Sequence, residues 1–153
     1  MSATSTDPEQ ERQQAVALFN EVWVLLDTAD RTAAQGERMV HAAHASRLHW
    51  EAVGTTENIA VADWLCSRVY AVLGRGEPAM YHARWCLERA ERESLPGWVR
   101  AEGHEALARA HALLGDLDEG RRHADEARKI CDSIDDAEDR NVVLGDLATL
   151  PLD

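Results

Sequence analysis

Apolar side chains along this chain recur at spacings of three and four residues, the period at which side chains share one face of an α-helix. Val16, Phe19, Trp23 and Leu26 are the clearest example. No stretch alternates apolar and polar residues as a half-buried strand does. The pattern therefore predicts an all-α protein of about seven helices, over residues 8–27, 32–53, 56–73, 77–94, 98–114, 117–132 and 135–147.

Residues that favour helix ends stand at the limits of these segments. Pro8 suits the first turn of a helix, and Thr32 precedes Gln35 by three residues, which is the spacing of a capping box. Gly74 and Gly115 follow directly after predicted helices, where glycine ends a helix and turns the chain. Because the connections are short, consecutive helices are expected to run antiparallel and to pack as hairpins.

One pattern of residues occurs twice at a constant offset of 41 positions. The matched pairs are Arg68/Arg109, Ala71/Ala112, Leu73/Leu114, Gly74/Gly115, His82/His123 and Ala83/Ala124. An internal repeat of this length is typical of stacked helical hairpins. The copies differ where Trp64, Tyr70 and Trp85 of the first are replaced by Glu105, His111 and Glu126 of the second. These unmatched positions are where a function beyond packing is expected.

The helix–glycine–helix units resemble the tetratricopeptide repeat family. Tyr70 stands where that family favours tyrosine, and Ala79 and Cys86 stand where it places small residues. Two features depart from the family pattern. The period is 41 residues instead of the usual 34, and Ala83 and Ala124 replace its characteristic aromatic residue.

The resemblance implies a right-handed superhelix of stacked hairpins that binds a peptide or a partner helix on its concave face. It divides a single domain, residues 8–150, into a degenerate leading hairpin, two repeats and a capping helix, over residues 8–54, 56–94, 97–133 and 135–148. Residues 1–7 are small and polar and are predicted to be disordered.

Composition excludes several classes of function. The 153-residue chain has a formal net charge of -12, so nucleic acid and anionic membranes are not expected as partners. It contains no apolar run of about 18 residues, and its first residues lack the basic start and apolar stretch of a signal peptide. Cys66, Cys86 and Cys131 are odd in number and far apart, which favours a reducing cytoplasm. Lys129 is the only lysine, a bias typical of a GC-rich bacterial genome.

Tryptophan and arginine dominate the hot spots of binding surfaces, and both are frequent in the middle of the chain. Trp64 and Arg68 stand one helical turn apart, and Arg47 is close to Trp50. The predicted binding groove contains Arg47, Trp50, Trp64, Arg68, Tyr70, His104 and His111. The alternative is that the rings fill gaps between helices and that Arg68 pairs with a nearby acid such as Asp63 or Glu77.

A second hypothesis is a metal centre at Glu37, His41 and His44. Their spacing places a carboxylate and two imidazoles on one helical face, within reach of one divalent ion. This ligand set suits zinc, iron or manganese. The motif is not HExxH, and exposed histidines on an alanine-rich helix are the favoured interpretation.

Three functions are therefore expected, in descending order. The first is a tetratricopeptide-like module without a cofactor that holds a peptide, a partner protein or a small ligand. The second is a metal-binding protein or metal-dependent enzyme. The third is a cofactor-free biosynthetic enzyme. A short stack leaves exposed end faces, so homodimerisation through the first or last helix is also expected.

Overall fold

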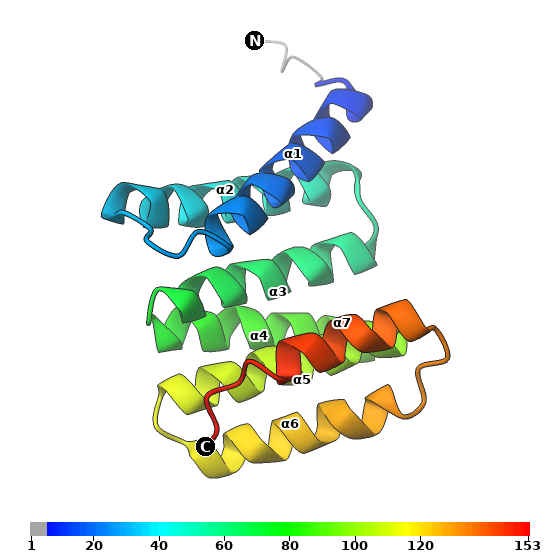
Figure 1. Cartoon of the computed structure of the whole chain (residues 1–153). Helices are drawn as coiled ribbons and strands as arrows, with labels where there is room; N and C mark the ends of the chain where they lie inside the picture. The colour runs from blue at the N-terminus through cyan, green and yellow to red at the C-terminus, as the bar shows by residue number, and fades with distance from the viewer. Residues whose placement is uncertain (1–5) are drawn as a thin grey trace.

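The computed structural model describes residues 6–153 and contains, over that range, seven α-helices and no strand (Figure 1). The helices are α1 (Pro8–Leu26), α2 (Ala33–Val53), α3 (Thr56–Val72), α4 (Gly76–Arg92), α5 (Gly97–Leu113), α6 (Leu117–Cys131) and α7 (Ala137–Leu147). The predicted all-α fold is confirmed. The expected disorder of residues 1–7 falls largely on residues outside the described part.

The helix ends follow the capping chemistry of the sequence. Thr32 and Gln35 form both hydrogen bonds of a capping box at the start of α2. Gly74 and Gly115 have φ values of 74° and 85°, a left-handed conformation that glycine adopts without the steric cost of a Cβ atom. The last helix begins two residues later than expected, because the side chain of Asp136 caps it by accepting from the backbone N–H of Asp139.

Consecutive helices pair as three hairpins, α1 with α2, α3 with α4 and α5 with α6, and α7 lies across the last hairpin (Figure 1). The first helices of successive hairpins, α1, α3 and α5, contact one another, and α7 continues this row beyond α5. Over the described residues α2, α4 and α6 make no such contacts with each other. We therefore call α1, α3, α5 and α7 the inner row, because helices that touch lie on the narrower side of a curved stack.

Small residues let the two rows approach closely. Ala79, Ala83, Cys86 and Ala90 of α4 are fully buried. Facing them, a Cβ atom added at Gly103 of α5 would lie 2.9 Å from the Cα of Leu87. Over residues 6–153, no helix is both long enough and apolar enough to cross a membrane.

Candidate functional site

A cavity of about 350 Å³ opens in the inner row between α1 and α7, with α3 and α5 beneath it. Its lining is mainly aromatic and apolar but includes three carboxylates. The lining residues are Phe19, Trp23, Val61, Trp64, Cys86, Trp98, Val99, Glu102, Asp139, Val142 and Asp146. An apolar pocket with a few convergent polar groups is the usual form of a ligand site.

A second hollow of about 270 Å³ adjoins this cavity and shares Phe19, Val61 and Trp98 with it. It extends the cavity toward Trp50 and Val16. We call the two together the tryptophan groove. Four of the five tryptophans of the chain line it, namely Trp23, Trp50, Trp64 and Trp98.

The floor of the groove is held by a buried charge network around Glu105, which is 1% exposed. Its Oε2 accepts a hydrogen bond from the indole N–H of Trp64 at 3.0 Å. Its Oε1 accepts from Arg68 at 3.3 Å and from the Nε of Arg109 at 3.0 Å. Arg68 also lies 3.7 Å from Asp146. Arg68 is therefore paired with acids of α5 and α7, not with Asp63 or Glu77.

Trp64 and Glu105 occupy the same position in the two repeats, since they are 41 residues apart. The preceding hairpin has Trp23 a further 41 residues back. The rings of Trp23 and Trp64 stack with their centroids 5.8 Å apart. Equivalent positions of successive hairpins thus contact one another directly along the inner row.

Glu102 differs from Glu105, although the two are one turn apart on α5. It is 5% exposed, and its Oε2 has no hydrogen-bond partner. Burial raises the pKa of Glu102 well above its usual range, and the nearby carboxylates of Glu105 and Asp146 raise it further. A carboxyl group in these surroundings holds its proton unless a cation replaces that proton.

The charges in this part of the groove do not balance. Glu102, Glu105 and Asp146 are three acids, whereas Arg68 and Arg109 supply two positive charges. Asp139 adds a further acid to the lining. At least one negative charge is therefore left to be neutralised, by a proton on Glu102 or by a bound cation. Since Glu102 also lines the cavity, the place for that cation is within the tryptophan groove.

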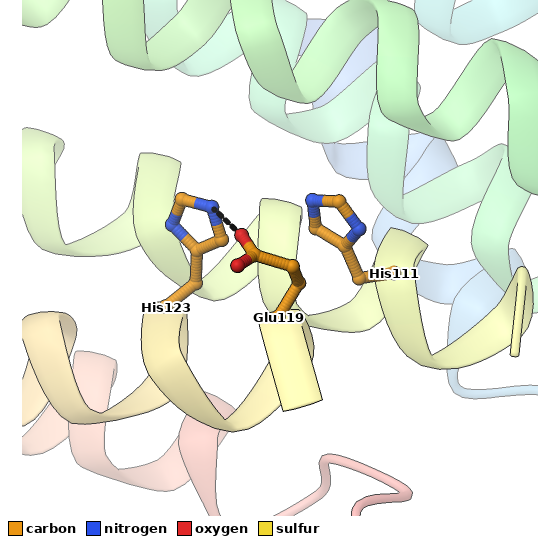
Figure 2. Close-up of side chains that lie close together, drawn as sticks. All are labelled: His111, Glu119 and His123. Carbon is orange, nitrogen blue, oxygen red and sulfur yellow. Dashed lines mark ion pairs between the residues drawn. The ribbon is translucent and has the colours of Figure 1, made fainter. Parts of the chain in front are cut away.

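His104 and His111 lie elsewhere, on the side of α5 that faces α6. The Nδ1 atoms of His104 and His123 are 2.9 Å apart, and the rings of His111 and His123 stack with an interplanar angle of 11°. Burial, together with the nearby His104 and Arg122, lowers the pKa of His123 to about 4. Figure 2 shows His111 and His123 with the carboxylate of Glu119 between their rings.

Arg47 and Tyr70 lie in a third place, among α2, α3 and α4. The Nε of Arg47 donates to Asp63 at 2.9 Å, and the Tyr70 hydroxyl is 2.8 Å from the Nε2 of His44. The structure therefore distributes the predicted groove over three places. Trp50 and Trp64 line the tryptophan groove, and Arg68 belongs to the charge network of Glu105 and Asp146 next to it. The other four residues, Arg47, Tyr70, His104 and His111, are separate from it.

The structure does not bring Glu37, His41 and His44 within ligand distance of one another. Glu37 pairs with Arg75 at 2.9 Å, and His41 is exposed. His44 is directed toward Tyr70 and His82. Residues seven positions apart on one face of a helix are separated by about 10 Å along its axis, so spacing in the sequence alone does not bring their side chains together.

Several groove residues were not expected from the sequence. Trp23 belongs to the apolar stripe of the first helix, and no role in binding was predicted for Asp139 or Asp146. The signal for Trp23 was present, because it precedes Trp64 by the repeat offset of 41. Asp146 carries no such signal, since its role depends on how α7 folds back over α5.

Comparisons with models of protein families, with curated proteins and with solved structures give no match.

Proposed function

We propose that the protein is a tetratricopeptide-like binding module that takes an extended peptide segment of a partner protein into the tryptophan groove. The segment carries a lysine or arginine between apolar residues. The observation that carries this proposal is the buried Glu102 oxygen without a partner in a cavity lined by tryptophans.

The charge and the rings support a cationic side chain. A lysine or arginine would satisfy the free Glu102 oxygen and supply the positive charge that the three acids lack. Tryptophan faces attract cations, with a gain of about 0.5–2 kcal/mol that is largest where water is excluded. Apolar neighbours of the basic residue would cover the remaining lining, which is formed by Phe19, Val61 and Val99 among others.

The length of the groove supports a peptide as the occupant. The two adjoining hollows extend from α7 past α5 and α3 to Trp50 near the end of α2. A single amine fills only one of them, whereas an extended chain gains about 3.3 Å per residue and follows both. The stack of hairpins agrees with this role, because repeat stacks use their concave surfaces for extended partners.

The cytoplasm is the proposed location, and the protein's three cysteines support it. All three are free and buried, as is typical of a reducing compartment. Homodimerisation through the first or last helix stays a prediction.

Pairs of synthetic twelve-residue peptides test the proposal. One member of each pair has a central lysine or arginine between leucines, and the other member has norleucine in place of the basic residue. Binding is followed by calorimetry and by tryptophan fluorescence. The basic peptides should bind at least about 10-fold more tightly than their norleucine partners, because a charged hydrogen bond is worth about 1.5–3 kcal/mol. Glu102→Gln should remove this difference, whereas Glu88→Gln, at an exposed surface pair, should preserve it.

Two results would contradict the proposal. In the first, lysine, arginine and norleucine peptides bind the wild-type protein equally. In the second, Glu102→Gln and Glu88→Gln have the same effect. If butylammonium alone binds as tightly as the peptides do, the cation site stands but the peptide occupant is wrong.

A further inference from the structure

His111, Glu119 and His123 form a second cluster, separate from the tryptophan groove and independent of its proposed function. His111 is near the end of α5, and Glu119 and His123 are one turn apart on α6. One possible ligand atom from each lies within 4.8 Å of the other two. In residues 6–153 no other three His, Cys, Asp or Glu residues converge in this way.

The spacing is close to that of a metal centre. A tetrahedral zinc ion binds imidazole nitrogen and carboxylate oxygen at about 2.0–2.2 Å, so two of its ligand atoms are about 3.4 Å apart. The Nε2 of His123 and the Oε2 of Glu119 are 3.9 Å apart, slightly more than this distance (Figure 2). The Glu119 side chain is 41% exposed and is free to rotate, so a modest change of its torsion angles brings the set to bonding distance.

Arg122 determines which nitrogen of His123 is free to bind. Its guanidinium Nη2 lies 3.2 Å from the Nε2 of His123. Arginine only donates hydrogen bonds, so this Nε2 must be the nitrogen that carries a lone pair. The Nδ1 of His123 then carries the proton and donates to the Nδ1 of His104 at 2.9 Å.

This is the arrangement that metal-bound histidines adopt. One ring nitrogen faces the ion, while the other donates to a neighbouring acceptor that fixes the ring. His104 takes the part of that acceptor here. The same Nη2 of Arg122 lies 2.8 Å from the Oε2 of Glu119. A positive group thus already occupies the space between the imidazole and the carboxylate.

Arg122 is a replaceable occupant of that space. Its side chain is 57% exposed, and an exposed arginine–carboxylate pair is only weakly stabilising because water screens both charges. A divalent ion would displace the guanidinium into solvent and retain both ligands.

Comparison with the first repeat separates the ring contacts that both repeats share from the metal ligands that only the second repeat has. There, His82 stands in place of His123 and stacks on Tyr70 at an interplanar angle of 12°, with its Nδ1 3.3 Å from Asp63. The stacked pair is therefore common to both repeats. The ligands are not, because the counterparts of His111 and Glu119 in the first repeat are Tyr70 and Pro78.

We propose that His111, Glu119 and His123 bind a divalent transition-metal ion such as Zn²⁺, with His104 fixing the ring of His123. Two imidazoles and one carboxylate suit a tetrahedral ion and leave its fourth position open. The ion would join α5 to α6 beyond the glycine turn that connects them.

Titration of tag-free protein with Zn²⁺, and with Co²⁺ as a spectroscopic probe, tests the proposal. One ion per chain should bind, and bound Co²⁺ should show the visible absorption of a tetrahedral site. Glu119→Gln, His111→Ala and His123→Ala should each weaken binding by at least about 10-fold. His104→Gln should weaken it by about 10-fold or more, as loss of an outer partner does.

Two variants keep the test decisive even if a histidine variant fails to fold. Arg122→Gln removes the competing cation and should tighten Zn²⁺ binding by about 2- to 5-fold. His41→Ala, at an exposed position on α2, should leave it unchanged. The proposal is overturned if the wild-type protein binds no stoichiometric ion. It is also overturned if Glu119→Gln binds like the wild type, or if His41→Ala weakens binding as much as Glu119→Gln.

Discussion

Glu102 and Glu105 are buried one turn apart on α5, yet replacement by glutamine should affect them in opposite ways. Glu105 is surrounded by donors that require its negative charge. Glu102 has a free oxygen and carboxylate neighbours that oppose its charge. Comparing the two glutamine variants therefore tests the charge network, because the same chemical change is made at two neighbouring buried positions.

Glu105→Gln should destabilise the protein by about 3 kcal/mol. Removing one partner of a buried ion pair costs about 3–5 kcal/mol, because the other charge is left uncompensated. We use the lower end of this range because both arginines retain a partner in the variant. Arg68 still pairs with Asp146, and Arg109 still donates a hydrogen bond to the hydroxyl oxygen of Thr149. For a chain of this length the midpoint of thermal unfolding falls about 2–4 °C per kcal/mol, so a loss of about 6–12 °C is expected.

Glu102→Gln should leave the protein as stable as the wild type near pH 4.5 and more stable at neutral pH. The pKa of Glu102 is raised in the folded state from its usual value of 4.5. The folded protein therefore binds this proton more tightly than the unfolded chain does. Wild-type stability should fall as the pH rises from 4.5 through the folded pKa, by about 1.4 kcal/mol per pH unit for one proton. Glutamine resembles the protonated acid and removes this loss.

Urea unfolding followed by circular dichroism, at intervals between pH 4.5 and 8, measures both effects. Glu126→Gln on α6 is the control, since this glutamate pairs with Lys129 at the surface, away from the Glu105 network. Our description of the network would be refuted if Glu105→Gln cost less than about 1 kcal/mol. Parallel pH profiles for the wild type and Glu102→Gln would equally refute it.

Three further predictions concern packing and thiol chemistry. Gly103→Ala places a Cβ 2.9 Å from the Cα of Leu87 and should cost about 1–3 kcal/mol in thermal unfolding; an unchanged midpoint would show that α4 and α5 separate freely. Gly74→Ala meets no atom within 4 Å but has a φ of 74°, so about 1 kcal/mol of strain is expected, and a stabilised variant would contradict this. Burial raises the pKa of the Cys66 thiol to about 12 and raises that of Cys86 also, so a disulfide reagent should modify both only after unfolding; prompt reaction of the folded protein would contradict this.

The helices were predictable because the information that sets them is local. Apolar periodicity, capping residues such as Thr32 and the turn glycines act within a few residues of the chain, and six of the seven predicted starts lie within one residue of the structure. The seventh start was displaced because both Asp135 and Asp136 have capping chemistry. The choice between them depends on backbone geometry, which the sequence does not state.

The site was less predictable because it depends on contacts between distant helices. Trp64 was predicted to line a groove and lines the cavity, whereas Arg68 lies outside the lining and pairs with Glu105 and Asp146. These partners, which decide the roles of Trp64 and Arg68, lie 37 or more residues further along. The second hypothesis placed a converging carboxylate and two histidines on α2, but spacing along one helix says nothing about which neighbour approaches it. The convergent set instead spans the turn between α5 and α6.

The hydrogen bond from Trp64 to Glu105 gives the hairpins a fixed order. Both residues hold the same position in successive copies, so a perfectly duplicated array would place identical side chains against each other. Two tryptophans can stack, as Trp23 and Trp64 do, but two buried glutamates would repel each other. Inserting a second copy of residues 97–133 should therefore destabilise the extended stack unless its glutamate is changed. The difference between the copies at this one position thus restricts which hairpin can follow which.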